Sequence, residues 1–371
     1  MSTEGTDELT PDWTVDPGTV LSRVLEERGL RQADLAERTG LSAKHINQVV
    51  KNKVPISGDV AMAFELALGT PATFWLRVMA EYEAHESAQR ANQYLSTFAD
   101  WARSFDRAAL LTNHVIESPD PVEAVAEKLL RFFGVASPAA YEDTYVRPRV
   151  SFRRAQQFAV AEPNTALWLR LVELKAQPGK AKDLNLPALK RTASLLPRMS
   201  ALPIVDGFTA ARDSLAEAGV SLVFVPEITG TRICAATWWF GSDRPVIGLT
   251  GRHKGVDTLW FNLMHEIGHI LLHPRRSSYL DLDEDMKASD GAEQEANKFA
   301  QTALVPTEQL SRLMSATTPQ DLALLASDLN VGLPVIAGQY AFHAHHPSAY
   351  KTVGKIRSKI TDTELAELAA V

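Results

Sequence analysis

The sequence predicts a multidomain chain: an all-α N-terminal bundle, a helical middle segment and an α+β C-terminal domain. Three observations lead to this fold class. The chain has 371 residues, too many for one small module. Apolar residues recur with helical spacing up to about residue 200. β-branched and aromatic runs separated by Gly, Pro and Asp begin near residue 219, and helical spacing returns from Asp257 to about Phe342.

These changes in pattern divide the chain into five segments. We expect an acidic flexible tail over residues 1–17, a helical bundle over 18–95, a helical connector over 97–204, the α+β domain over 205–350 and a C-terminal segment over 351–371.

Composition excludes several classes of protein. No apolar run approaches the roughly 18 residues that span a bilayer, and the acidic N-terminus is the opposite of a signal peptide. The single cysteine, Cys234, rules out an internal disulfide and fits a reducing compartment. We therefore expect a cytoplasmic protein without a membrane partner. The net charge of −7 argues weakly against nucleic-acid binding by the whole surface, but residues 39–58 contain lysines and no acidic residue.

The N-terminal bundle should contain five short helices. Ser42 is a good N-cap for the third helix, and Thr70 with Pro71 opens the fifth. The turn "RTGLS" joins the second and third helices, which is the arrangement of a helix-turn-helix. The five predicted helical stretches are "TVLSRVLEERG", "QADLAERTG", "AKHINQVVK", "SGDVAMAFELALG" and "PATFWLRVMAEYEA".

The third of these helices carries a polar stripe suited to DNA. Its outward positions follow one another at i, i+3, i+4 and i+7. Asn and Gln amides can bond to adenine edges, and Lys can reach guanine or phosphate, as a helix in the major groove requires. A solvated helix face is the alternative, but the turn, the cap and the acid-free surroundings favour DNA binding. The predicted DNA-binding residues are Ser42, Lys44, His45, Asn47, Gln48 and Lys51.

Residues 18 to 85 resemble the Cro/C1, or XRE, type of helix-turn-helix domain, closest to its antitoxin-like branch. The residues that carry the likeness are "LRQADLAERTGLSAKHINQVVKNKVPIS" and "LGTPATFWLRVMAEYE". The resemblance implies binding of double-stranded DNA at a palindromic operator by a homodimer.

The connector has no motif. "SFRRAQQFAVAEPNTALWLRLVELKA" predicts a basic amphipathic helix pair with Trp168, Leu169 and Leu171 in a core. Beyond it, "VSLVFVPEI", "RICAATWWFG" and "PVIGLTG" predict three strands, which we expect to form a short antiparallel sheet against helices.

The stretch "HEIGHILLH", residues 265 to 273, predicts a metal site. Asp257 is expected to cap its helix. His265 and His269 are four residues apart, so both imidazoles project from one side of the helix and can bind one Zn²⁺ ion. Glu266 is placed to take a proton from a water and pass it to a leaving amine. Chance spacing with buried, hydrogen-bonded histidines is the alternative interpretation.

His273 is a weaker candidate ligand. It lies about 12 Å along the helix from His265, too far for one ion to bind both. We expect it to contact a ligand or the substrate cleft, or to act as a cation at the helix C-terminus.

The third ligand should be a carboxylate on the helix "GAEQEANKFAQTALVP". Glu295 lies at the edge of its apolar face, which would direct it toward the metal helix, while Glu293 is expected to point outward or to support a ligand. Two His and one Glu with a water form an open catalytic zinc site. The apolar face consists of Ala292, Ala296, Phe299, Ala300 and Ala303.

Residues from about 205 to 343 resemble the ImmA/IrrE family of zinc metallopeptidases, of the zincin type with the His-Glu-x-x-His motif. The likeness is carried by "GVSLVFVPEI", "HEIGHILLH", "EQEANKFAQTALVP" and "LNVGLPVIAGQYAF". It implies zinc bound by His265, His269 and Glu295, Glu266 as catalytic base, and cleavage of a repressor-type protein. Peptide hydrolysis also requires an oxyanion stabiliser, for which Tyr279, Tyr340 and His343 are equivalent candidates. "HAHH" at 343–346 is alternatively an exposed loop that collects metal nonspecifically.

Two functions remain open from the sequence. One is a DNA-bound zinc endopeptidase that cleaves a repressor or itself. The other is a non-enzymatic transcription regulator or antitoxin whose C-terminal domain senses a ligand or a metal.

Overall fold

The computed structural model describes residues 15–146, 162–176, 182–240, 243–273, 279–282, 291–343, 353–354 and 356–371. The chain divides into two compact units. The first comprises the chain up to Ala102 together with Pro121–Glu127, and the second comprises Arg103–Asp120 and Lys128–Val371.

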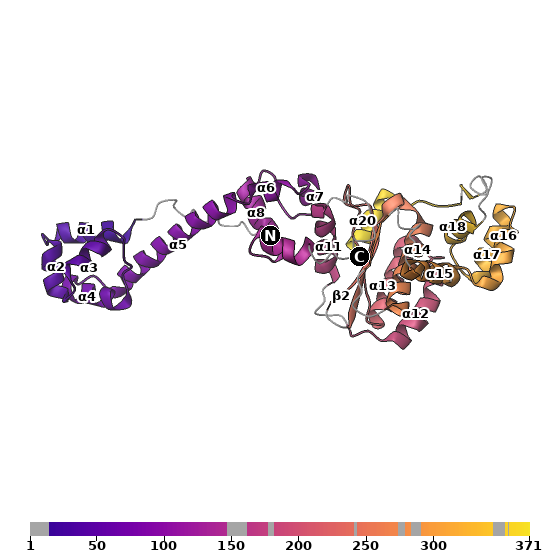
Figure 1. Cartoon of the computed structure of the whole chain (residues 1–371), viewed down its shortest axis with the longest axis horizontal. Coiled ribbons are helices and arrows are strands. Elements are labelled where there is room, and N and C mark those ends of the chain that lie inside the picture. Colours follow the sequence, from indigo (N-terminus) through magenta and orange to yellow (C-terminus); the bar gives the residue numbers. More distant parts are fainter. Residues whose placement is uncertain are drawn as a thin grey trace, which may run out of the picture. The chain divides into compact units, whose positions relative to one another are not determined.

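Five helices build the core of the first unit, as the apolar spacing predicts (Figure 1). Their inward side chains include Leu21, Ile46 and Trp75, none of which is exposed to solvent. Phe64 and Trp75 pack edge to face with ring centroids 5.4 Å apart. The helices are α1 (Pro17–Glu27), α2 (Gln32–Thr39), α3 (Ala43–Val50), α4 (Gly58–Leu68) and α5 (Ala72–Ser96). The fifth has 25 residues and is therefore longer than the short helix expected from the sequence.

Asn52 fixes the end of α3 against the start of α1. Its backbone is left-handed (φ 54°), and its side chain accepts a hydrogen bond from Gly18 N at 2.9 Å and donates one to Asp16 at 2.5 Å. Asp16 also caps α1 by accepting from Thr19 N at 2.8 Å. Burial opposes ionisation of Asp16, but the hydrogen bonds from Thr19 and Asn52 outweigh it and lower the pKa of the carboxyl.

The described part of the middle segment is helical, as predicted. In the second unit Phe105, Phe133 and Tyr141 pack with ring centroids 4.8–5.7 Å apart, and the Tyr145 hydroxyl donates to Phe133 O at 3.0 Å. The elements are α6 (Ala99–Arg103), α7 (Arg107–Thr112), α8 (Val122–Phe133), α9 (Pro138–Tyr141), η1 (Glu142–Val146), α11 (Glu162–Ala176) and α12 (Leu186–Met199).

A mixed four-stranded sheet follows α13 (Ile204–Glu217), with strand order β1-β3-β2-β4. β2 is antiparallel to β3 and β4, but β1 is parallel to β3, so the expectation of an antiparallel sheet is wrong for that pair. After β1, the chain first forms β2, leaving one strand position between them, and β3 then fills the position between β1 and β2. As the antiparallel neighbour of β2, β3 runs in the same direction as β1. The strands are β1 (Ser221–Phe224), β2 (Ile233–Phe240), β3 (Arg244–Leu249) and β4 (Tyr279–Leu282).

Helices cover both faces of this sheet (Figure 1). α11 lies on one face, where the Trp168 ring occupies the space that a side chain at Gly248 would fill. Trp168 and Leu169 are buried as predicted, whereas Val172 is fully buried and Leu171 only partly. The first half of α11 is buried on all sides and its last turn is exposed, so it lacks the single apolar face of the predicted amphipathic helix. Residues 151–161 of the predicted helix pair lie outside the described residues.

The other face packs against α13 and α14 (Val256–Leu272), and α12 packs against these two helices. Leu189 and Leu196 of α12 belong to the same core as Ile267 of α14. The boundary expected at residue 205 falls at the start of α13, whose core side chains pack together with those of α12. The remaining elements are η3 (Arg252–Lys254), α15 (Gly291–Leu304), η5 (Thr307–Gln309), α16 (Leu310–Met314), α17 (Pro319–Leu329), α18 (Leu333–His343) and α20 (Asp362–Ala370).

No single helix among the described residues has the length and hydropathy needed to cross a membrane. α17 and α18 meet that test only when taken together, across a bend of 118°.

Candidate metal centre and nucleic-acid interface

Helix α14 carries the two histidines of the predicted metal site. Twelve of its seventeen residues are buried, because it lies between the sheet and several helices. His265 and His269 are 3% and 2% exposed, and their Nε2 atoms are 2.9 Å apart. The spacing of four residues therefore converges both imidazoles on one point, as the sequence predicts.

Gly268 lets α15 approach α14 closely at this point. A Cβ atom there would lie 3.2 Å from Ala296 Cα and 3.2 Å from Phe299 Cδ1. Carbon atoms in ordinary contact are about 3.5–4.0 Å apart, so glycine is required for this helix spacing. The close approach brings the first turns of α15 against the histidines.

The carboxylate that reaches the histidines is Glu293. Its Oε2 lies 3.2 Å from His265 Nε2 and its Oε1 lies 3.6 Å from His269 Nε2. Burial raises the pKa of Glu293, but hydrogen bonds and charge attraction from the two histidines outweigh it and lower the pKa to about 2.

The expectation that Glu295 points inward toward the metal helix is wrong, because it is Glu293 that reaches the histidines. Around α15, Glu293 lies about 20° from the buried Leu304, and Glu295 lies about 180° from it. The Glu295 side chain is accordingly 68% exposed. The expected apolar face of this helix included Phe299 and Ala303, which are only partly buried in the structure. The buried positions of this helix are Ala296, Ala300 and Leu304.

The donor set of His265, His269 and Glu293 fits a divalent metal. One ligand atom from each residue lies within 4.8 Å of the others. Two ligands about 2.1 Å from a tetrahedral zinc ion are separated by about 3.4 Å, close to the 2.9, 3.2 and 3.6 Å found here. Two imidazoles and one carboxylate leave a fourth position open, which is the donor set of catalytic zinc sites.

Two other predicted residues lie beside this cluster. Glu266 follows His265 on α14 and is fully buried. His273 ends α14 with an extended backbone, and its Nδ1 lies 2.9 Å from His269 Nδ1. Burial is the main cause that lowers the pKa of His273.

The predicted DNA-contacting helix is capped as expected. Ser42 Oγ accepts a hydrogen bond from His45 N at 3.1 Å. Lys44 is exposed, and Gln48 is partly exposed. Asn47 donates to Gln32 Oε1 at 3.2 Å, so one amide of the predicted stripe links α3 to the first residue of α2.

Gln32 was not singled out from the sequence, because its hydrogen bond with Asn47 joins two residues on opposite sides of the turn between α2 and α3. His45 is partly buried, as Asn47 and Gln48 are.

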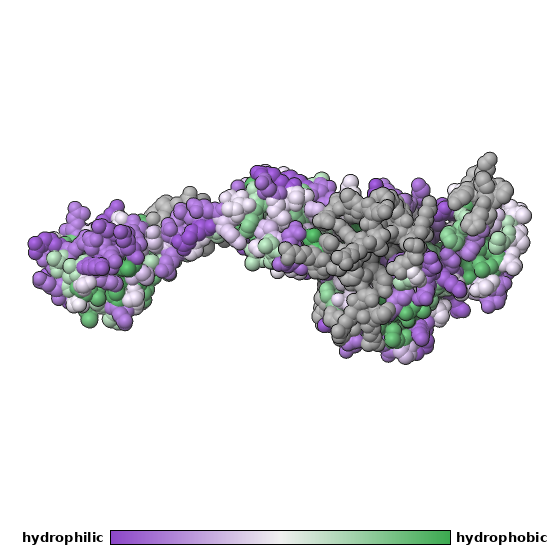
Figure 2. Space-filling view, viewed as in Figure 1, coloured by the Kyte–Doolittle hydropathy of each residue, from purple (hydrophilic) through white to green (hydrophobic). Residues whose placement is uncertain are grey.

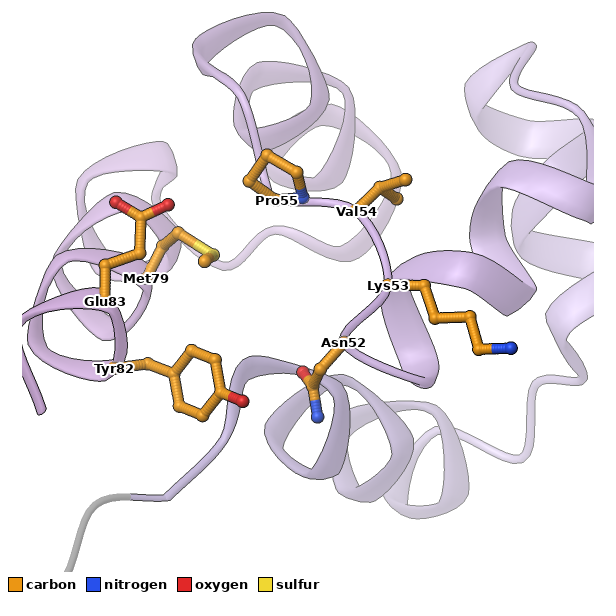
Figure 3. Close-up of a pocket in the computed structure, with 7 residues that line it drawn as sticks. All are labelled: Asn52, Lys53, Val54, Pro55, Met79, Tyr82 and Glu83. Atoms are coloured by element: carbon orange, nitrogen blue, oxygen red, sulfur yellow. The ribbon is translucent and has the colours of Figure 1, made fainter. Parts of the chain in front are cut away.

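The loop after α3 is held against α5. Ile56 N donates to Met79 Sδ at 3.4 Å. Residues from the loop and from α5 line a pocket of about 150 Å³, and Lys53 extends away from it (Figure 3). Lys51 and Lys53 are both exposed, so the loop presents two cations next to the end of α3.

Comparison with protein-family models identifies both regions. A family described as helix-turn-helix matches residues 21–75, and a family described as IrrE N-terminal-like domain matches residues 223–338. The chain joins these two domains. No curated protein sequence matches it. The helix-turn-helix match suggests a DNA-binding regulator. The IrrE-like match, which contains all residues of the candidate metal centre, suggests a domain of the metallopeptidase type.

Of the three candidate oxyanion stabilisers, Tyr279 lies within the matched residues 223–338, and Tyr340 and His343 lie just beyond them. Tyr340 is buried on α18, which packs along α14, and His343 ends the same helix. Tyr279 begins β4, but its side chain lies outside the described residues, as do residues 344–346 of "HAHH". His343 is not part of the metal-binding group found among the described residues.

The start of the metal helix is fixed differently from the prediction. Asp257 does not cap α14; its Oδ2 accepts from Arg357 Nη2 at 2.6 Å. Asp257 is 8% exposed, and a side chain at Gly338 would collide with its carboxylate. The C-terminal segment therefore supplies the charge partner of a carboxylate at the first turn of α14.

Proposed function

We propose that the chain is a DNA-binding transcription regulator whose IrrE-like domain is a zinc endopeptidase that cleaves a repressor-type protein or the chain itself. The observation that carries this proposal is the cluster of His265, His269 and Glu293 with Glu266 adjacent on the same helix. A purely structural site has no need of a carboxylate base at that position. Zinc held there supplies Lewis acidity to the scissile carbonyl and lowers the pKa of water.

Glu293 and Glu266 have different roles in the proposed hydrolysis. The low pKa of Glu293 keeps it anionic, as a metal ligand must be. Glu266 accepts the proton of the attacking water and delivers it to the leaving amine nitrogen.

Glu266→Gln tests the peptidase function. The change keeps size and shape and removes the base, so zinc content and operator binding are retained while hydrolysis falls by about 10²–10⁴-fold. Purified wild type and variant are incubated with zinc and candidate repressors, and fragments are identified by mass spectrometry. In cells, a peptidase circuit carrying the variant stays uninduced whatever the signal.

A non-enzymatic regulator is the second candidate, and the complete burial of Glu266 favours it, because a substrate must reach this carboxylate. It predicts normal induction in the Glu266→Gln strain and no fragment in wild type. That combined result would retire the peptidase function.

We also propose that the helix-turn-helix domain binds a palindromic operator as a homodimer. Lys44, Gln48 and Lys51 are the residues proposed to contact DNA, and α4 and α5 offer the surface for the second copy. Figure 2 shows apolar surface gathered on the side of this unit where α4 lies. The exposed apolar side chains of the two helices are Met62, Leu66, Phe74 and Leu76.

Leu66→Glu tests the dimer, because Leu66 is 82% exposed and its replacement leaves the core intact. A charge in an apolar interface opposes association. Analytical ultracentrifugation of the variant should show a lower dimer fraction than wild type. Leu324→Glu, a matched change at an exposed leucine of α17, should leave the fraction unchanged. Equal dimer fractions in all three proteins would contradict this choice of surface.

A further inference from the structure

Each of the two histidines in the metal centre has a partner at its second ring nitrogen. His265 Nδ1 lies 3.0 Å from Asn297 Oδ1, and His269 Nδ1 lies 2.9 Å from His273 Nδ1. The Nε2 atoms face each other and Glu293. An imidazole that gives its Nε2 lone pair to a metal carries its proton on Nδ1, so Asn297 Oδ1 and His273 Nδ1 are the acceptors of those protons.

The acceptor role of His273 determines its own tautomer. A neutral imidazole that accepts at Nδ1 carries its proton on Nε2. His273 Nε2 lies 3.3 Å from Glu295 Oε2, so this proton is directed at a carboxylate. The three side chains form one chain of hydrogen bonds from His269 through His273 to Glu295.

The two partners differ in character. Asn297 is a neutral amide on α15, four residues after Glu293. His273 is 6% exposed, and the chain that runs through it ends at Glu295, which is 68% exposed and charged. The extended backbone of His273 (φ −106°, ψ 163°) lets its ring turn back over His269 at the end of α14. A continued helix would not give this backbone conformation.

We propose that His273 and Glu295 are positioning residues for the metal ligand His269. The pair fixes the orientation and tautomer of His269 so that its Nε2 points to the metal. The carboxylate also makes the Nε2 of His269 a stronger electron-pair donor to the metal. This inference rests on the proposed zinc site. It gives Glu295 a role outside the ligand set and explains why a third histidine follows the two ligands.

A surface ion pair or a helix-terminal cation would leave zinc affinity unchanged. A protonated His273 cannot accept the Nδ1 proton of His269, and an exposed pair contributes little to stability. The positioning role therefore makes a distinct prediction about metal binding.

Zinc dissociation constants measured by competition with a chromophoric chelator test it. His273→Leu removes the acceptor and should raise the zinc Kd by about 10–100-fold, the usual effect of losing a partner of a metal ligand. His273→Gln keeps an oxygen acceptor and an N–H donor, so it should recover a substantial part of this loss. Glu295→Gln should raise the Kd less than His273→Leu does. His85→Leu, the same change at a histidine of α5, is the matched control and should bind zinc like wild type.

Two results would overturn the inference. One is a wild-type Kd in His273→Leu with circular dichroism showing a folded protein; the other is a Gln variant as impaired as the Leu variant. Failure of the proposed zinc site is seen separately, as the absence of zinc binding by wild type itself.

Discussion

Gly268→Ala should weaken zinc binding while the IrrE-like domain stays folded. The added Cβ would meet Ala296 Cα and Phe299 Cδ1 at 3.2 Å, so α15 must move by a few tenths of an ångström. Overpacking of this kind costs about 1–3 kcal/mol, and the better helix propensity of alanine returns about 1 kcal/mol. The net loss of stability is therefore modest, about 0–2 kcal/mol.

The metal site is more sensitive than the fold to this movement. Glu293 stands three residues before Ala296 on α15, so the same displacement carries its carboxylate away from the histidines. Metal–ligand distances vary by only about 0.2 Å. We expect the zinc Kd to rise roughly tenfold, which corresponds to about 1.4 kcal/mol.

Chelator competition and thermal unfolding of the metal-free protein measure the two effects. Gly291→Ala, at the start of α15, is the matched control, because a Cβ added there would meet none of the surrounding atoms outside its own helix turn within 4 Å. If Gly268→Ala binds zinc as tightly as Gly291→Ala does, the close approach of α14 and α15 does not set the geometry of the metal centre.

Three further predictions address the other parts of the chain. Gln48→Ala should cost about 1–3 kcal/mol of operator affinity and relax the base preference at one position in competition assays. Lys51→Ala should weaken binding to all DNA sequences alike and lower the slope of log K against log salt concentration. The reverse pattern would contradict the proposed roles of the two residues. The pKa of Asp16 is lower in the folded protein, so the ionised carboxyl stabilises the first unit at pH values above its ordinary pKa, and this stabilisation is lost as pH falls through the folded-state value. The unfolding temperature of wild type should therefore fall further between about pH 5 and pH 2 than that of Asp16→Asn. Parallel plots of unfolding temperature against pH for the two proteins would count against this prediction. Arg357→Ala should destabilise the IrrE-like domain by roughly 1–3 kcal/mol in urea unfolding, because it leaves the buried Asp257 carboxylate without its charge partner, and an unchanged midpoint would refute this.

Local patterns predicted those features whose cause is local. Ser42 caps α3 in the structure because its hydroxyl meets an amide three residues away, a relation that the sequence states directly. His265 and His269 converge because one turn of helix separates them. Strands β1 to β3 were recognisable from β-branched and aromatic runs bounded by turn residues.

Features that depend on packing were predicted less well. Glu295 was favoured over Glu293 because the sequence does not show which part of a broad apolar face is buried. Asp257 suggested a helix cap, but its partner Arg357 lies 100 residues away. The four-residue strand β4 and the parallel pairing of β1 with β3 arise from the order of strands in space, which no local pattern specifies.

The central claim is that His265, His269 and Glu293 bind zinc in the IrrE-like domain. Elemental analysis of the purified full chain, Glu293→Ala and Glu295→Ala, each loaded with zinc and desalted, tests it most directly. We predict one zinc ion per chain in wild type, zinc lost in Glu293→Ala, and zinc retained with lower affinity in Glu295→Ala. Zinc retained in Glu293→Ala and lost in Glu295→Ala would contradict the assignment of the ligands.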